Sequence, residues 1–300
     1  MRMKTALGLD VGGTQIKAGL VTQTGQLLAR WITPTGEGGP ALLSRLVSLI
    51  GQVQIETPSD RQPVGIGIGV PGPVTEGRVH GCVNLVWGEV AVEEKLRQAT
   101  GLPVRAQNDA DVAALGEWWV GEGRQCTSFL FVTVGTGVGS GLVQQGRVWT
   151  GAHGAAGEIG HFTVRPEETA VCTCGNRGCL EQYASASALL DWANRFGGTY
   201  ASAQEVMQGA KSGEISAQQA LAQMTDTLGV ALAAMANGVD PERIVLGGGV
   251  SQAGEFWRAK VAQAFVAHAF GPVKQTPIRL SQLKNDAGML GAAKLILDEI

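Results

Sequence analysis

Two segments far apart in the chain share one order of apolar and polar positions. Each has an apolar run typical of a strand, a glycine-rich turn and a second apolar run, and the two segments span 7–21 and 129–143. Glycine permits the sharp backbone bend that joins such strands. The pattern therefore predicts one hairpin in each half of the chain, with turns at 12–14 and 135–139.

Apolar periodicity predicts further strands and helices along the chain. Short apolar runs predict strands at 26–32, 64–70, 104–107 and 244–246. Apolar residues at helical spacing predict helices at 41–53, 90–100, 110–119, 185–196, 217–237, 256–270 and 288–300. Strands that alternate with helices are typical of α/β proteins. The pattern starts afresh after Gly121, so we place a boundary near Val120 and expect domains at 1–119 and 120–287.

Composition limits the classes of protein that the chain can belong to. It has 300 residues, of which 44% are hydrophobic and 16% charged, which suits two compact domains. The net charge is −3 and no stretch concentrates lysine and arginine, so we expect no binding of nucleic acid by bulk charge. The sequence has neither an apolar run of about 18 residues nor a signal-peptide pattern. We therefore expect a cytoplasmic protein with no membrane partner.

The two glycine turns are candidates for phosphate binding. Glycine lets backbone N–H groups approach a bound anion closely, as in phosphate-binding nests. Asp10 follows the first predicted strand, where its carboxylate could hold a metal ion on the phosphates. One such turn is weak evidence, but a pair in two halves of one chain predicts two lobes that grip a polyphosphate, as in a phosphotransferase.

Asn108 and Asp109 lie at the junction between a predicted strand and a predicted helix. Such loop positions often carry catalytic groups. Asp109 is also well suited to cap the helix N-terminus, a common role of aspartate. The residues alone leave these two interpretations nearly even.

Three of the five cysteines fall within eight residues, and a histidine lies upstream of them. One histidine and three thiolates form a standard tetrahedral zinc site. The predicted ligands are His161, Cys172, Cys174 and Cys179. The alternatives are buried cysteines without a metal or an adventitious disulfide. An iron–sulfur cluster would need a fourth thiolate, which the spacing of Cys82 and Cys126 does not suggest.

Two carboxylates flank this cysteine cluster, Glu158 before it and Glu181 after it. Carboxylates held together by a metal site could accept hydrogen bonds from the vicinal hydroxyls of a sugar. The alternative is that both are solvated surface residues, and for Glu181 alone this is the better interpretation.

Six motifs together resemble the signatures of the ROK family, which contains repressors, uncharacterised reading frames and sugar kinases. The motifs lie at 9–17, 108–114, 134–139, 157–161, 172–181 and 246–249. The resemblance covers nearly the whole chain and is greatest to bacterial ATP-dependent glucokinases. It implies an actin-like or hexokinase-like (ribonuclease H-like) fold with a cleft between two α/β domains. It also implies that helix 288–300 packs on the first domain, and that the protein is a homodimer or homotetramer.

The resemblance implies a role for each matching residue. Asp109 matches the catalytic base that takes a proton from the 6-hydroxyl of a hexose, and Asp10 matches the residue that holds Mg²⁺. The matching ATP-binding residues are Gly12, Gly13, Thr14, Gly135, Thr136, Gly137, Gly139, Gly248 and Gly249. The matching sugar-binding residues are Asn84, Asn108, Asp109, Glu158, His161 and Glu181. The role of Lys17 stays open, because it could equally be a solvated strand residue.

The resemblance favours glucose as the substrate but separates related sugars poorly. N-acetylmannosamine, N-acetylglucosamine, fructose and allose are alternatives, decided by the loops at 71–77 and 84–88. A sugar-responsive repressor is a remote alternative: family repressors carry a helix-turn-helix domain before the first phosphate loop, and only nine residues precede Asp10 here. A sugar-binding protein without activity would have damaged phosphate loops, and both loops are intact.

Overall fold

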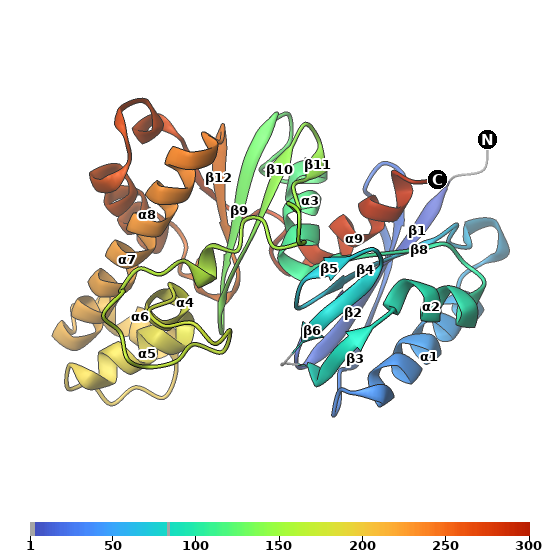
Figure 1. Cartoon of the computed structure of the whole chain (residues 1–300), viewed down its shortest axis with the longest axis horizontal. Coiled ribbons are helices and arrows are strands. Elements are labelled where there is room, and N and C mark those ends of the chain that lie inside the picture. The colour runs from blue at the N-terminus through green and yellow to red at the C-terminus, as the bar shows by residue number, and fades with distance from the viewer. Residues whose placement is uncertain (1–3, 83–84) are drawn as a thin grey trace. The chain divides into compact units, whose positions relative to one another are not determined.

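The structure, a computed structural model, describes residues 4–82 and 85–300 (Figure 1). The chain forms two units. The first contains 1–125, 141–156 and 285–300, and the second contains 126–140 and 157–284. The expected domains, 1–119 and 120–287, differ from these units chiefly in the segment 141–156. This segment belongs to the first unit because Gly141 lies against a helix of that unit: a Cβ on Gly141 would be 2.9 Å from the Ala110 carbonyl oxygen.

The first unit is built on a five-stranded sheet. Its strands, in spatial order, are β3 (Leu27–Pro34), β2 (Gln15–Thr22), β1 (Thr5–Val11), β4 (Ile66–Val70) and β8 (Val104–Asn108). β1, β2 and β3 pair antiparallel, as the predicted hairpin requires, whereas β1, β4 and β8 run parallel. The parallel strands therefore all end at one edge of the sheet.

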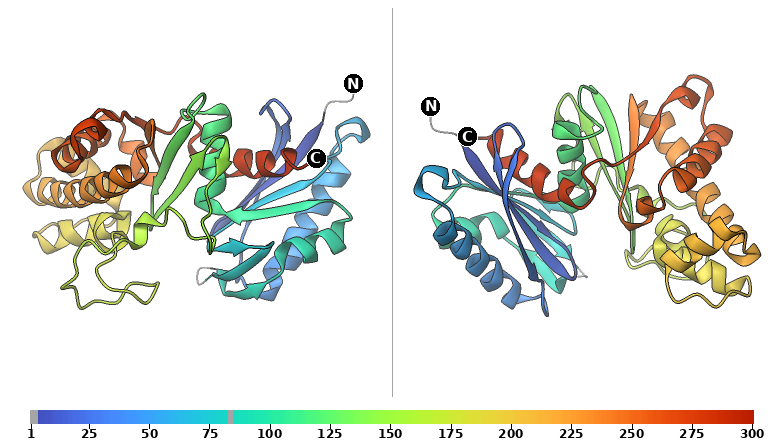
Figure 2. Two further views of the ribbon diagram at one scale, coloured as in Figure 1. Left: turned by 45° about the horizontal axis from the view of Figure 1, so that its top comes forward. Right: turned by 180° about the vertical axis from the view of Figure 1, so that it is seen from behind.

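Helices cover both faces of this sheet, as Figures 1 and 2 show. On one face lie α1 (Pro40–Glu56) and α2 (Val92–Thr100), and on the other lie α3 (Asp109–Val120) and α9 (Ala287–Leu297). Alternate residues of β1 explain the arrangement. Leu7 and Leu9 are fully buried in the core that includes Leu42 and Leu46 of α1, whereas Gly8 faces α9.

The contact between α9 and the sheet depends on glycine. A Cβ on Gly8 would lie 1.9 Å from the Met289 carbonyl oxygen, and one on Gly67 would lie 1.6 Å from that of Ala292. Real Cβ atoms do not approach backbone oxygen so closely, so only glycine permits this packing. The alternation of glycine with apolar residues in β4 therefore encodes a close approach by a helix.

Gly67→Ala is expected to destabilise the protein by about 3 kcal/mol, because the added methyl group must push α9 off the sheet. Urea denaturation followed by circular dichroism would measure the change. Gly51→Ala is the matched control: Gly51 lies in α1 and a Cβ there would meet nothing within 4 Å, so the change should be neutral or stabilising. Equal stability of the two variants would show that α9 can shift without cost.

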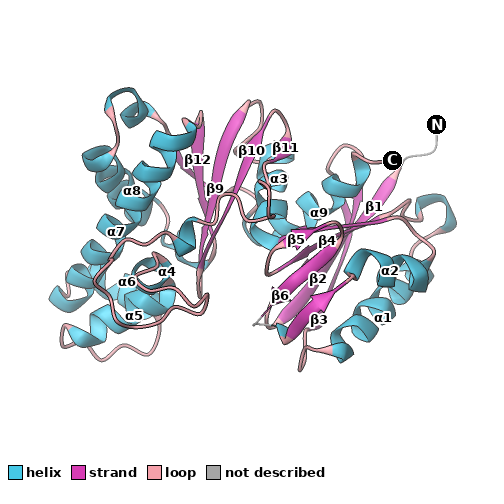
Figure 3. Ribbon diagram, in the orientation of Figure 1, coloured by secondary structure: helices cyan, strands magenta, loops and turns pink. Residues whose placement is uncertain are grey.

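The second unit contains most of a second five-stranded sheet, whose strand order is β11-β10-β9-β12-β13 (Figure 3). The strands are β9 (Ser128–Val134), β10 (Val138–Gln144), β11 (Arg147–Val148), β12 (Arg243–Gly247) and β13 (Ile278–Leu280). Helices α4 (Glu181–Ala184), α5 (Ala186–Arg195), α6 (Ala203–Ser212), α7 (Ile215–Val239) and α8 (Glu255–His268) gather on one side of β9 and β12. The end of β10 and β11 fall in the segment 141–156.

Most predicted elements are present with small shifts of their ends, and a few elements were not predicted. A small antiparallel sheet of β5 (Val74–Thr75), β6 (Arg78–Cys82) and β7 (Trp87–Val90) was missed, as were α4, α6, β11 and β13. These elements are short or weakly apolar, so they carry little periodic signal. Within the described ranges, no helix has both the length and the apolar character needed to cross a bilayer.

Candidate functional site

The predicted site residues form two groups, one in each unit. Asp10, Asn108 and Asp109 belong to the first unit, and the cysteine cluster with Glu158 and Glu181 belongs to the second. Asn84 lies outside the described residues.

Strand register places Asp10 and Asn108 at the same edge of the first sheet. Asp10 pairs with Gly69 of β4, and Gly69 pairs with Gln107 of β8. Asp10 is therefore two strand spacings, about 10 Å, from the end of β8. Carboxyl ends of adjacent parallel strands are a usual location of ligand sites in α/β proteins.

The carboxylate of Asp10 forms an ion pair with Lys17. The two residues are cross-strand partners, and Lys17 Nζ lies 3.2 Å from Asp10 Oδ2. Gly288 at the start of α9 leaves room for this side chain, since a Cβ there would lie 2.7 Å from Asp10 Cγ. Burial raises the pKa of Asp10, and the charge and hydrogen bond of Lys17 partly offset this effect. Lys17 is thus not a solvated strand residue: it compensates the partly buried carboxylate of Asp10.

The cap of α3 is supplied by Asn108 and not by Asp109. Asn108 Oδ1 accepts hydrogen bonds from the backbone N–H of Ala110 at 2.8 Å and of Asp111 at 3.2 Å. Its Nδ2 donates to the Gly72 carbonyl at 3.3 Å. Asp109, half-buried, is the first residue of the helix, and its Oδ1 also accepts from the N–H of Ala110, at 2.9 Å. A capping role therefore does not explain why position 109 is an aspartate.

The first glycine turn is held by backbone bonds and leaves its tip open. The N–H of Gly12 donates to the Gln15 carbonyl at 3.0 Å, and the Thr35 hydroxyl donates to the Gly12 carbonyl at 2.6 Å. A Cβ on Gly13 would meet nothing within 4 Å. Neither Gly12 nor Gly13 has a positive φ. Glycine is therefore not needed here for an unusual turn conformation. It leaves the backbone N–H groups accessible, as a bound phosphate requires.

The second glycine turn carries a carboxylate that the sequence did not place there. Glu181 Oε2 accepts a hydrogen bond from the N–H of Val138 at 3.1 Å. A Cβ on Gly137 would lie 2.1 Å from the same oxygen, so a larger residue there would displace the Glu181 carboxylate. The Thr173 hydroxyl donates to Glu181 Oε1 at 3.4 Å. Glu181, at the start of α4, therefore links the cysteine cluster to the turn and is not a solvated surface residue.

Gly248 and Gly249 follow β12 and lie beside the second turn. Gly248 has a φ of +81°, a conformation that favours glycine. A Cβ on Gly248 would lie 2.4 Å from the carbonyl oxygen of Val134, the residue before the turn. The structure thus brings together the two segments of this unit that were predicted to bind the nucleotide.

Glu158 interacts electrostatically with both His161 and Glu181. Burial raises the pKa of Glu158, the positive form of His161 opposes this effect, and the charge of Glu181 adds to it. Ser140 fixes the loop: its hydroxyl donates to the Gly157 carbonyl and accepts from the N–H of Ile159 at 3.2 Å. Sequence reasoning gave Ser140 no role, although a serine within a glycine-rich run was a signal.

The four predicted zinc ligands converge. Their ligand atoms all lie within 4.8 Å of one another. Cys172 Sγ is 3.8 Å from His161 Nδ1, and Cys174 Sγ is 3.6 Å from Cys179 Sγ. Zinc–sulfur bonds of about 2.3 Å in a tetrahedron place sulfur atoms about 3.8 Å apart. The cluster has the dimensions of a zinc site, and its thiols are free in the structure, which disfavours the disulfide alternative.

Comparisons with known proteins identify relatives along the whole chain. The glucokinase of Halalkalibacterium halodurans is 36% identical, covering 97% of this chain and 94% of that protein. The N-acetylmannosamine kinase of Escherichia coli is 33% identical, covering 98% and 99%. The crystal structure of a ROK family glucokinase from Streptomyces griseus, in complex with glucose and AMPPNP, superposes with a TM-score of 0.85 at 28% identity, covering 97% and 98%.

These similarities confirm the predicted two-domain, actin-like α/β fold class. They also agree with the six motifs that carried the resemblance in the sequence. The model of the ROK family matches residues 6–299. Because that match spans nearly the entire sequence, the chain belongs to the ROK family.

Proposed function

We propose that the protein is an ATP-dependent hexose kinase that phosphorylates glucose on its 6-hydroxyl. The observation that carries the proposal is the arrangement at the end of β8. Asn108 caps α3, so helix formation does not require Asp109, and Asp109 lies at the same sheet edge as Asp10. Similarity to glucokinases along the whole chain supports the choice of reaction.

Asp109 would act as the general base. Its carboxylate would accept the proton of the sugar 6-hydroxyl while that oxygen bonds to the γ-phosphorus and the bond to ADP breaks. A base of this kind contributes about 10²- to 10⁴-fold in rate. Positioning and charge neutralisation supply most of the remaining acceleration in phosphoryl transfer.

The phosphates would lie on the two glycine turns, with the adenosine at Gly248 and Gly249. Asp10 would hold Mg²⁺, which neutralises phosphate charge when bound. Lys17 would then be released from Asp10 and could offer its positive charge to the phosphate oxygens. The open tip at Gly13 and the close packing at Gly137 and Gly248 support this assignment.

The sugar would be bound by Asn108, Glu158, His161 and Glu181. The electrostatic interactions of Glu158 with His161 and Glu181 support the grouping of the last three. We further propose that His161 and the three cysteines hold one structural Zn²⁺. Metal ligation at one nitrogen fixes the orientation of a histidine ring, so that the other nitrogen can be directed at a hydroxyl.

Purified protein is expected to release ADP from MgATP only when a hexose is present, with the highest kcat/KM for glucose. A coupled ADP-release assay over hexoses and N-acetylhexosamines would measure this. N-acetylmannosamine is the competing substrate because a kinase for that sugar is 33% identical. Turnover of N-acetylmannosamine without turnover of glucose would overturn the substrate and keep the reaction. Absence of sugar-dependent ADP release would favour a regulatory or binding member of the family.

A further inference from the structure

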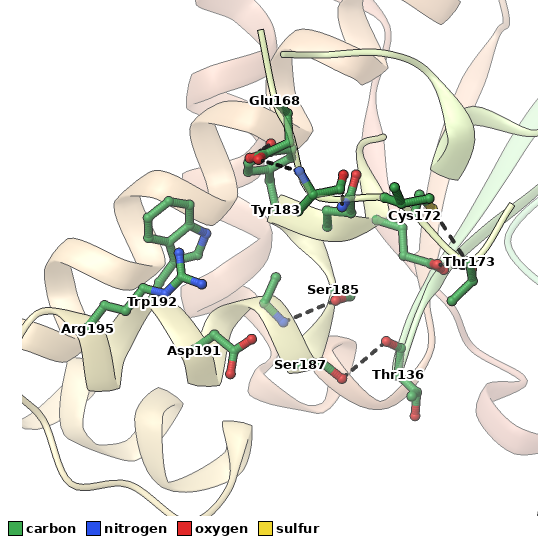
Figure 4. Close-up of a pocket in the computed structure, with 15 residues that line it drawn as sticks. Thr136, Glu168, Cys172, Thr173, Tyr183, Ser185, Ser187, Asp191, Trp192 and Arg195 are labelled. Carbon is green, nitrogen blue, oxygen red and sulfur yellow. Dashed lines mark hydrogen bonds between the residues drawn. The ribbon is translucent and has the colours of Figure 1, made fainter. Parts of the chain in front are cut away.

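A cavity of about 380 Å³ opens in the second unit between the segment 168–173 and α5 (Figure 4). This volume falls within the range of small-ligand sites. Most of its lining has no part in the proposed reaction. The side chains on which the argument rests are Glu168, Thr173, Glu181, Asp191, Trp192 and Arg195.

Tyr183 and Trp192 form an aromatic wall of the cavity, and Trp192 also stacks on Phe196 further along the chain. The Trp192 ring lies 6.4 Å from that of Tyr183 and 5.8 Å from that of Phe196, measured between centroids. The Tyr183 hydroxyl donates to Glu168, whose other oxygen accepts from the N–H of Thr169 and Ala170. These hydrogen bonds lower the pKa of Glu168 to about 2 and hold the wall in place.

The cavity also contains polar groups that the fold does not use. Among the described residues, the exposed carboxylate of Asp191 makes no hydrogen bond or ion pair, and neither does the Arg195 guanidinium, which lies over the Trp192 ring at 5.6 Å. Asp191 and Arg195 are one turn apart on α5 and line the same cavity (Figure 4). A carboxylate and a guanidinium beside an aromatic ring can together accept from and donate to adjacent hydroxyls.

Charge decides which ligand chemistry fits. The carboxylates of Glu168, Glu181 and Asp191 outnumber the guanidinium groups of Arg195, which lines the cavity, and Arg165, which lies over the Tyr183 ring of its wall at 5.0 Å. The resulting negative potential opposes a phosphate group. A neutral sugar meets no such barrier: its C–H groups can contact the part of the half-buried Trp192 side chain that lines the cavity, while its hydroxyls bind the charged groups.

We propose that this cavity is a second carbohydrate site, which binds a neutral, unphosphorylated sugar and excludes sugar phosphates. This proposal goes beyond the proposed function, because neither Asp109 nor Glu158 lines the cavity. Glu181 connects the two sites, since it lines the cavity and also accepts from Val138 in the glycine turn.

Isothermal titration of the intact chain with glucose, N-acetylglucosamine and maltose, without ATP, tests the proposal. At least one of these sugars should bind at two sites per chain. Asp191→Asn and Trp192→Phe should weaken sugar binding in the cavity at least tenfold and leave binding at the proposed kinase site unchanged. Glu158→Gln should weaken binding only at the proposed kinase site. Glucose 6-phosphate should bind the cavity at least tenfold more weakly than the neutral sugar.

Glu167→Gln is the matched control. Glu167 is exposed and sits beside Glu168 in sequence but does not line the cavity. It removes the same charge as Asp191→Asn and should leave both sites intact. The proposal would be overturned if each of the three sugars bound at one site per chain and Asp191→Asn did not affect that binding. It would also be overturned if the cavity bound glucose 6-phosphate more tightly than the neutral sugar. Two sites without sugar-dependent ADP release would instead refute the kinase function and leave the second site standing.

Discussion

Asp109→Asn is expected to lower kcat by about 10²- to 10⁴-fold, because the amide keeps the size of the side chain but cannot take the proton of the sugar hydroxyl. The helix should be unaffected. Asn108 supplies its cap, and the asparagine oxygen can still accept from the N–H of Ala110. Sugar affinity should therefore change little. The coupled ADP-release assay gives kcat, and calorimetric titration gives sugar affinity.

Asp60→Asn provides the control for this substitution. Asp60 is exposed in a short 3₁₀ turn of the same unit, so its variant should retain full activity. An Asp109→Asn enzyme within tenfold of the wild-type kcat would show that the carboxylate is not the base. A large loss of sugar affinity in that variant would instead assign Asp109 to binding.

Cys179→Ser is expected to remove zinc and weaken sugar binding at least tenfold. Elemental analysis should find one zinc per wild-type chain and much less in the variant, since loss of a buried thiolate opens the tetrahedron. His161 would lose its fixed orientation, and Glu181, two residues downstream, would lose its support. Titration with glucose measures the second effect.

The contact between Glu181 and Val138 changes what is expected for ATP. The sequence alone predicts that removal of the thiolate weakens sugar binding far more than ATP binding, because the nucleotide loops lie elsewhere in the chain. In the structure, Glu181 accepts from the second glycine turn. ATP affinity should therefore also fall, although less than sugar affinity.

Cys82→Ser serves as the control, because Cys82 is a buried thiol of β6 and lies outside the zinc cluster. It should keep its zinc and its affinity for sugar. If Cys179→Ser lost zinc but bound sugar normally, the cluster would stabilise the local fold without contributing to the sugar site. The assignment of His161 to the sugar site would then have to be withdrawn.

The sequence determined those features that depend on neighbouring residues. Both hairpins, the long helices α1, α3 and α7, and the two glycine turns follow from apolar periodicity and from backbone freedom at glycine. The cysteine cluster is also local, since three of its ligands lie within eight residues. Joint recognition of the motifs identified the family. Glucose as substrate, zinc, the oligomeric state and the cytoplasmic location stay predictions.

Tertiary structure decided which of these local features meet. Glu181 reaches Val138 across 43 positions, and Lys17 pairs with Asp10 only through strand register. The glycines of β1 and β4 signal a close approach, but only the folded chain shows that α9, more than two hundred residues away, is the partner. Periodicity reports which face of an element is apolar and says nothing about what packs on it. Contacts between distant segments depend on the whole arrangement of sheets and helices. The hydrogen bond of Glu181 to the glycine turn, the ion pair of Lys17 and the cavity beside α5 therefore emerged only from the fold.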